Sequence, residues 1–186
     1  MIDHVYIVHG YSASPADHWF QWLQNKLASD NISADILKMP SPSKPELADW
    51  TQEISLNVRD IHKGTYIVAH SLGCAAVLRF LEKLGPSEQA GGIILVSGFT
   101  KPLPSLPILD EFTREPFDFD KIKVAVAGTP IVVASKNDEI VPVEFSKELA
   151  RNIDADFHEL DQGGHFLGSD GFTTFPLVYE LLTRKS

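Results

Sequence analysis

The sequence predicts an α/β fold in which a mostly parallel sheet of about six strands is flanked by helices on both faces. Three observations lead to this prediction. Short aliphatic runs alternate with helical patterns along the whole chain, no repeat or linker interrupts them, and three polar motifs closely follow predicted strands. Such alternation favours right-handed crossovers between parallel strands. At 186 residues we expect one domain spanning residues 1–186.

The N-terminal part of the chain contains two predicted strand–helix pairs. In order they are a strand over 4–8, a helix over 15–29, a strand over 36–39 and a helix over 47–60. The first helix is predicted because Trp19, Leu23 and Leu27 fall on one stripe. The second is predicted because Trp50 and Ile54 are at helical spacing. A proline-rich turn separates the second strand from the second helix.

The remainder of the chain continues the alternation. We expect strands over 65–68, 92–96, 130–135 and 157–160, and helices over 73–84, 143–152 and 172–184. The runs 65–68 and 92–96 are apolar throughout, which is typical of strands covered on both faces of a parallel sheet. Residues 97–123 contain several prolines and no firm period, with only a weak helical pattern near the end.

Charge and cysteine content exclude several function classes. The chain has 16 basic and 25 acidic residues, a formal charge of −9, and no basic cluster longer than Arg184-Lys185. Nucleic acid and anionic membrane surfaces would therefore repel it. The single cysteine, Cys74, can form no intrachain disulfide, and no cysteine pair exists to bind zinc. No Gly-x-Gly-x-x-Gly follows the first strand, so we expect no metal and no cofactor.

The chain start predicts no export. Residues 1–8 lack a basic region followed by a long apolar run, and no stretch reaches the roughly 20 apolar residues that span a bilayer. We therefore expect a cytoplasmic protein.

Ser71 is the candidate nucleophile. It lies in Ala69-His70-Ser71-Leu72-Gly73, where a buried strand turns into a helix. Small flanking residues are needed in such an elbow because the strand and helix backbones pass closely. The usual pattern has glycine at both flanks, and here the first is Ala69. A serine that merely caps the helix is the alternative reading.

A carboxylate and a histidine follow in the order Ser…Asp…His of the α/β-hydrolases. Asp138 comes a few residues after the strand 130–135, and a carboxylate there can hold a histidine in its useful tautomer. Glu139 is an adjacent competitor that we expect to point elsewhere, and Asp110 is a weaker alternative. His165 follows the last strand and a Gly-Gly pair, and would act as general base.

The oxyanion hole would use two backbone N–H groups, from Leu72 after the nucleophile and from Tyr11 after the first strand. Four side chains are candidates for a substrate pocket: Phe99, Leu103, Phe166 and His18. The apolar residues of 98–123 either form a small cap with an acyl pocket or fold onto the core. The side chain of His70 is expected to point away from the pocket.

These residues together resemble a known family. His9-Gly10, Asp17-His18-Trp19, Met39-Pro40, Leu95-Val96-Ser97 and Gly164-His165-Phe166, with the elbow and Asp138, extend the match over nearly the whole chain. The chain resembles the small α/β-hydrolases of the retinoblastoma-binding-protein-nine type, a compact serine hydrolase family with bacterial members. This resemblance implies a doubly wound sheet with few strands and a Ser71–Asp138–His165 triad. The Leu-x-Cys-x-Glu motif for retinoblastoma protein is missing, since Ala75 and Ala76 follow Cys74, and that partner is not expected.

The leading hypothesis is a metal-free serine hydrolase that forms an acyl-enzyme on Ser71 from a small-molecule ester, thioester or amide. A carboxylesterase is favoured because esters are the least demanding acyl donors. An aminopeptidase or amidase is the enzymatic alternative. A binding module with a vestigial site is the non-enzymatic alternative, since fold alone does not determine function.

Overall fold

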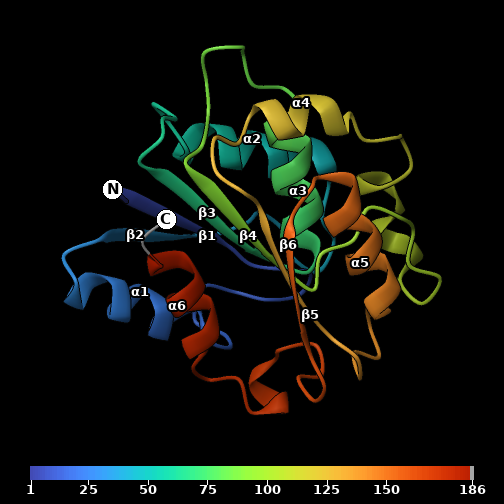
Figure 1. The fold of residues 1–186 in the computed structure, drawn as a ribbon. Coiled ribbons are helices and arrows are strands. Elements are labelled where there is room, and N and C mark those ends of the chain that lie inside the picture. The colour runs from blue at the N-terminus through green and yellow to red at the C-terminus, as the bar shows by residue number, and fades with distance from the viewer. Residues whose placement is uncertain (185–186) are drawn as a thin grey trace.

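The computed structural model describes residues 1–184, and Figure 1 shows one sheet with helices on both of its faces. The strands are β1 (His4–Val8), β2 (Ser33–Leu37), β3 (Thr65–His70), β4 (Gly92–Val96), β5 (Ile131–Ser135) and β6 (Asp156–Leu160). The helices are α1 (Phe20–Ser29), α2 (Leu47–Asn57), α3 (Leu72–Leu81), α4 (Phe119–Val124), α5 (Val143–Asn152) and α6 (Pro176–Thr183), with 3₁₀ turns η1 (Pro107–Phe112) and η2 (Gly168–Asp170). The six strands pair in parallel throughout, so the predicted fold class is confirmed.

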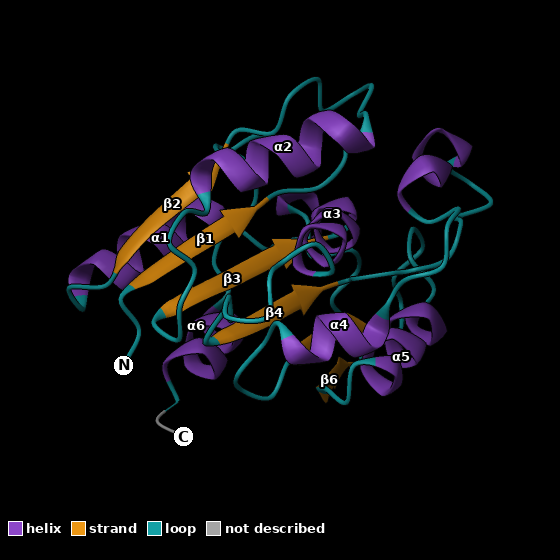
Figure 2. Cartoon of the chain, turned by 90° about the horizontal axis from the view of Figure 1, so that it is seen from above, coloured by secondary structure: helices purple, strands orange, loops and turns teal. Residues whose placement is uncertain are grey.

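The strand order is β2-β1-β3-β4-β5-β6, which places β1 between β2 and β3. The chain leaves β1 toward one edge of the sheet and returns to place β3 on the other side of β1. Loops that follow β1 and β3 therefore diverge, and this divergence opens a crevice at the carboxyl ends of the strands. Figure 2 shows these strands side by side, with their arrowheads at one edge of the sheet.

Alternate strand residues fill two separate cores. In β4, Ile93 and Leu95 pack with α2, α3, α4 and α5, whereas Ile94 and Val96 pack with α1 and α6. This alternation follows from the period of two in a β-strand. Both faces are apolar because both are covered, as expected of a parallel sheet.

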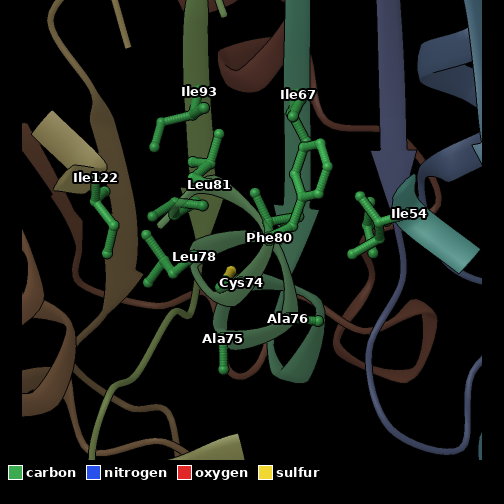
Figure 3. Packing of buried hydrophobic residues seen from close by; sticks show 14 of the residues in the cluster. Ile54, Ile67, Cys74, Ala75, Ala76, Leu78, Phe80, Leu81, Ile93 and Ile122 are labelled. Atoms are coloured by element: carbon green, nitrogen blue, oxygen red, sulfur yellow. The ribbon is translucent and has the colours of Figure 1, made fainter. Parts of the chain in front are cut away.

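Helix α3 is buried on all sides, with every residue from Leu72 to Leu81 inaccessible to solvent or nearly so. Figure 3 shows Ile67 of β3 and Ile93 of β4 beside Phe80 and Leu81 of this helix. The small side chains of its first turns allow the neighbouring elements to approach closely. A helix held this firmly can fix the position of the residue that precedes it.

Several predicted boundaries are wrong. Helices α2 and α3 each end three residues earlier than expected, at Asn57 and Leu81. Helix α1 begins at Phe20 rather than at residue 15, because residues 11–19 form turns in which His18 has a positive φ of 55°. Strand β2 begins three residues earlier and ends two residues earlier than expected, because it pairs in register with β1 from Ser33 to Leu37. Helix α6 begins at Pro176, a residue suited to the first helical position.

The helices are short. Helix α2 spans 11 residues. Among residues 1–184 no helix combines the length and the hydropathy that crossing a bilayer requires.

Residues 98–123 are folded onto the core. Their buried apolar side chains belong to the same cluster as α3: Phe99, Leu103, Leu109, Phe112, Phe117 and Ile122. Only η1 and the start of α4 are regular here, which agrees with the weak pattern in the sequence. Most apolar side chains of this segment therefore pack in the core, whereas Ile108 is exposed.

A buried arginine of α3 anchors this segment. Arg79 is 5% exposed and donates to the backbone carbonyls of Phe112, Glu115 and Pro116. Its guanidinium also pairs with Glu82 at 2.9 Å. One side chain thus satisfies three carbonyls of an irregular segment that has few backbone partners of its own.

We expect Arg79→Ala to lower the free energy of unfolding by about 3–5 kcal/mol, because it leaves Glu82 and three carbonyls without their partner. Urea unfolding of both proteins measures this difference. Arg114→Ala is the matched control, since Arg114 lies in the same segment but is exposed, and it should change stability by less than about 0.5 kcal/mol. Equal losses in the two variants would contradict the anchoring role.

Candidate active site

Ser71 lies in a sharp turn between β3 and α3. Its backbone has φ 54° and ψ −122°, a strained conformation for a residue with a side chain. A Cβ on Gly73 would lie 2.6 Å from the carbonyl oxygens of Val8 and His9, so only glycine fits there. The other flank, Ala69, is fully buried without conflict. The turn therefore tolerates alanine before the serine but requires glycine after it.

The structure brings Ser71, His165 and Asp138 together, although they come from three different loops. His165 Nε2 lies 2.9 Å from Ser71 Oγ, and His165 Nδ1 lies 2.8 Å from Asp138 Oδ2. With Asp138 ionised, Nδ1–H donates to the carboxylate and Nε2 accepts from the serine hydroxyl. A hydroxyl linked in this way to an imidazole and a carboxylate is the arrangement of a serine nucleophile with its base.

Asp138 is held by four hydrogen bonds. Besides the bond from His165, its Oδ1 accepts from the amides of Ile140 and Val141 at 2.9 Å each, and its Oδ2 accepts from Ser97 Oγ at 2.8 Å. The side chain is only 2% exposed. Burial alone would raise the pKa of Asp138, but its hydrogen bond and proximity to His165, with the two amides, leave the pKa below its usual range. His165 is bonded to Asp138 and not to Glu139 or Asp110.

Three side chains hold the loop that carries His165. Asp170 Oδ2 accepts from the amides of His165 and Leu167 at 2.9 and 3.0 Å. His70 Nε2 donates to the carbonyl of His165 at 2.8 Å. Asn137 Oδ1 accepts from the amides of Gly163 and Gly164.

His70 lies behind His165, and the expectation that it points away from the pocket is wrong. Its ring centroid is 4.9 Å from that of His165, and the residue is among those that line the cavity beside Ser71. Burial, with His165 nearby, holds the pKa of His70 well below its usual range, so the ring is neutral. The reason for the error is the length of β3: the strand extends through residue 70 and alternation turns this side chain toward α1.

The two backbone amides predicted for the oxyanion hole come from the two loops next to Ser71. Leu72 opens α3, and Tyr11 follows β1 on the wall of the same cavity. Among the hydrogen bonds of residues 1–184, neither amide donates to a protein acceptor. The loop before Tyr11 is fixed by His9, whose Nε2 accepts from Met39 N at 3.1 Å and whose Nδ1 donates to the carbonyl of Gly10 at 2.9 Å.

A cavity of about 350 Å³ opens beside the serine. Its lining residues are Gly10, Tyr11, Ala13, His18, His70, Ser71, Ser105, Leu106, Glu139, Ile140, His165 and Leu167. Four of the predicted site residues line this cavity: Ser71, His165, Tyr11 and His18. His18 Nδ1 accepts from Gly168 N at 2.9 Å, and burial lowers the pKa of His18.

The structure does not place Phe99, Leu103 or Phe166 at this cavity. Phe99 and Leu103 are buried in the cluster around α3. Phe166 has φ 57°, which turns its ring away from the site and stacks it on Phe175 at 5.0 Å. Apolar character in the sequence did not distinguish a core side chain from a pocket side chain. Leu106, Ile140 and Leu167 supply the apolar wall instead.

Comparisons with known proteins agree with this geometry. The chain matches the model of the serine hydrolase family over residues 5–184. It is 55% identical over 183 residues to the candidate hydrolase YdeN of Bacillus subtilis (strain 168), covering 98% of this chain and 96% of YdeN. This chain belongs to the serine hydrolase family.

Solved structures extend the comparison to the fold. The crystal structure of the B. subtilis ydeN gene product has a TM-score of 0.95 and 54% identity, and 97% of each chain is covered. A candidate hydrolase of the alpha/beta superfamily from Xanthomonas campestris has a TM-score of 0.67 at 15% identity, covering 97% of this chain and 98% of that one. The fold is that of an α/β-hydrolase, and the predicted resemblance to the small members of that fold is confirmed.

Sequence reasoning missed three residues that hold the site: Ser97, His70 as a support of His165, and Asp170. Ser97 stands in the Leu95-Val96-Ser97 stretch, which was singled out only for its resemblance to a family. The sequence feature that could have identified Ser97 is a polar residue at the carboxyl end of a buried strand. Asp170 is a turn aspartate five residues after His165, and such residues usually bond their own turn.

The buried, neutral His70 predicts a pH dependence of stability. Below the ordinary imidazole pKa of about 6.5 the unfolded chain binds a proton at this residue that the folded chain does not. The free energy of unfolding should therefore fall as the pH falls below about 6.5. His70→Gln, whose amide can still donate to the carbonyl of His165, should reduce this slope by up to about 1.4 kcal/mol per pH unit. Urea unfolding between pH 8 and 5 measures both slopes, and equal slopes would contradict a neutral His70.

Proposed function

We propose that this chain is a carboxylesterase-type serine hydrolase that cleaves small acyl donors through an acyl-enzyme on Ser71. The observation that supports the proposal best is the hydrogen-bonded chain from Ser71 through His165 to the buried Asp138, next to a cavity. This hydrogen-bonded series lowers the stability of the folded protein, because it requires a buried carboxylate and a strained backbone at the serine. A vestigial site would not be expected to keep all three groups in bonding distance.

The first half-reaction follows from the distances. Ser71 Oγ attacks the acyl carbon while His165 Nε2, 2.9 Å away, accepts its proton. Asp138 stabilises the imidazolium that forms and keeps its orientation. The amides of Leu72 and Tyr11 donate to the oxyanion, and the N-terminus of α3 favours the negative charge there.

Acylation is completed when His165 gives its proton to the leaving alcohol, the tetrahedral intermediate collapses, and the acyl group remains on Ser71. In the second half-reaction a water molecule attacks the carbonyl carbon of the acyl-enzyme while His165 takes a proton from it. The second tetrahedral intermediate then collapses, the bond from Ser71 Oγ to the acyl carbon breaks, His165 returns the proton to Oγ, and the acid is released. An alkoxide leaves more readily than an amide anion, so esters require less of His165 than amides do.

The cavity limits the size of the substrate. A volume of about 350 Å³ is at the small end of ligand sites. Residues 98–123 contribute Ser105 and Leu106 to its wall, and this segment is anchored by Arg79 rather than free to move. We propose that it acts as a fixed wall within one domain of residues 1–186, and that the substrate is a short-chain acyl donor.

Ser71→Ala should abolish covalent labelling by a fluorophosphonate probe, because the nucleophile is removed while the fold is retained. His165→Ala should also prevent labelling, since the serine then has no base. The measurement is in-gel fluorescence of purified proteins, with hydrolysis of p-nitrophenyl butyrate in parallel. Loss of turnover should approach the 10⁶-fold order known for such triads.

Ser105→Ala is the matched control, because Ser105 lines the same cavity without contacting His165. It should label as the wild type does. Absence of labelling in folded wild-type protein, or labelling that persists in Ser71→Ala, would refute the proposed nucleophile and favour a binding module.

Ser97→Ala should lower kcat about tenfold with little change in KM, because a hydrogen bond to the carboxylate that orients His165 is lost. Steady-state kinetics on a short-chain ester measures both constants. Ser146→Ala is the control: Ser146 is equally buried and donates to the carbonyl of Gly98, so its loss should lower stability without lowering kcat. A Ser97→Ala variant with unchanged kcat would exclude a role in positioning Asp138.

A further inference from the structure

The charge of the cavity beside Ser71 is determined by few side chains. Its titratable lining residues are Tyr11, His18, His70, Glu139 and His165. Glu139 is the only carboxylate among them, and it is exposed at the opening of the cavity. The other carboxylate nearby, Asp138, is buried behind His165 and bonded to it.

The imidazole rings that line the cavity do not neutralise the negative charge of Glu139. Burial lowers the pKa of His18, and burial together with His165 lowers that of His70 well below the usual range. Both rings are therefore neutral at neutral pH. Their hydrogen bonds agree, because His18 Nδ1 accepts from Gly168 N and is not protonated.

Basic side chains do not neutralise the negative charge of Glu139 either. Within residues 1–184, neither lysine nor arginine lines the cavity. Lys101 and Lys136 are within a few residues of lining residues, but they pair with Glu148 at 2.7 Å and with Asp161 at 2.6 Å. Glu139 itself has no ion-pair partner in the described part of the chain. Glu139 is thus a carboxylate of the cavity lining that no cation of the described residues neutralises, on a chain whose net charge is −9.

We propose that the cavity selects small acyl donors that carry a cationic group, and that Glu139 is the side chain which contacts that group. The inference rests on the proposed hydrolase function and adds the class of substrate. Alkylammonium and amino groups are the cations of suitable size for a cavity whose apolar wall is formed by Leu106, Ile140 and Leu167. A methylated ammonium would contact these apolar side chains while its charge faces the carboxylate.

The same charge disfavours anionic acyl donors. Thioesters of coenzyme A carry phosphates, and half-esters of dicarboxylic acids carry a carboxylate. Neither would find a cation at this cavity, and both would be repelled by Glu139. Of the acyl donors considered from the sequence, simple neutral or cationic esters therefore fit better than the coenzyme thioesters.

The test uses pairs of esters that differ only in charge. Choline butyrate and 3,3-dimethylbutyl butyrate place the charge in the alcohol. The phenyl esters of trimethylammonioacetate and of 3,3-dimethylbutanoate place it in the acyl group. The quantity compared is the ratio of kcat/KM for the cationic ester to that for its neutral isostere. Comparing this ratio between wild type and variant cancels the different intrinsic reactivities.

Glu139→Gln should lower the ratio by about fivefold for at least one pair, the upper end for an exposed charge pair. The change should be in KM, because the contact is made equally in the ground and transition states. Raising the salt concentration from 20 to 500 mM should reduce the wild-type ratio and leave that of the variant nearly constant. Glu180→Gln on α6 removes the same charge from an exposed site outside the cavity, and should alter neither ratio.

The outcomes separate the two proposals. If neutral esters are hydrolysed and fluorophosphonate labels Ser71, but Glu139→Gln changes neither ratio, the cation inference is wrong and the hydrolase function stands. An equal fall in the ratio for Glu180→Gln would attribute the effect to net charge and would also overturn the inference. If wild-type protein neither labels nor hydrolyses any of the four esters, the hydrolase function fails and the substrate class fails with it.

Discussion

The close approach of the β3–α3 turn to the end of β1 is the constraint on which the site depends. Ser71 has a left-handed backbone, and Gly73 lies against the carbonyls of Val8 and His9 with no room for a Cβ. Because α3 is buried along its whole length, the turn cannot relax by moving the helix. The serine hydroxyl is therefore presented at the point where the strand order reverses.

A second requirement is the burial of a carboxylate without a permanent cation. Asp138 meets it through hydrogen bonds from Ser97, Ile140 and Val141, with His165 as the fourth donor. Ser97 directly follows β4 and Asp138 follows β5, so this bond joins the loops at two neighbouring strand ends. The sheet thus supports the charge on which the histidine relies, and a uniform apolar core could not do so.

The orientation of His165 depends on one residue that is far away in the sequence and on one in its own loop. His70, at the end of β3, donates to its carbonyl, and Asp170 holds its amide. The rings of His18, His70 and His165 lie in series, with centroids 5.8 and 4.9 Å apart. Burial keeps His18 and His70 neutral, so the row of imidazoles supports His165 without opposing the proton that it accepts.

Local patterns in the sequence were sufficient for the α/β fold, for the strands that carry Ser71, Asp138 and His165, and for the order of those three residues. Periodicity and turn chemistry are properties of short segments, which is why they can be read without the fold. The tertiary structure alone decided that Phe99, Leu103 and Phe166 belong to the core, that His70 faces the site, and that Ser97 bonds Asp138. These outcomes depend on which way a side chain points after its segment has packed, and packing joins residues that are remote along the chain.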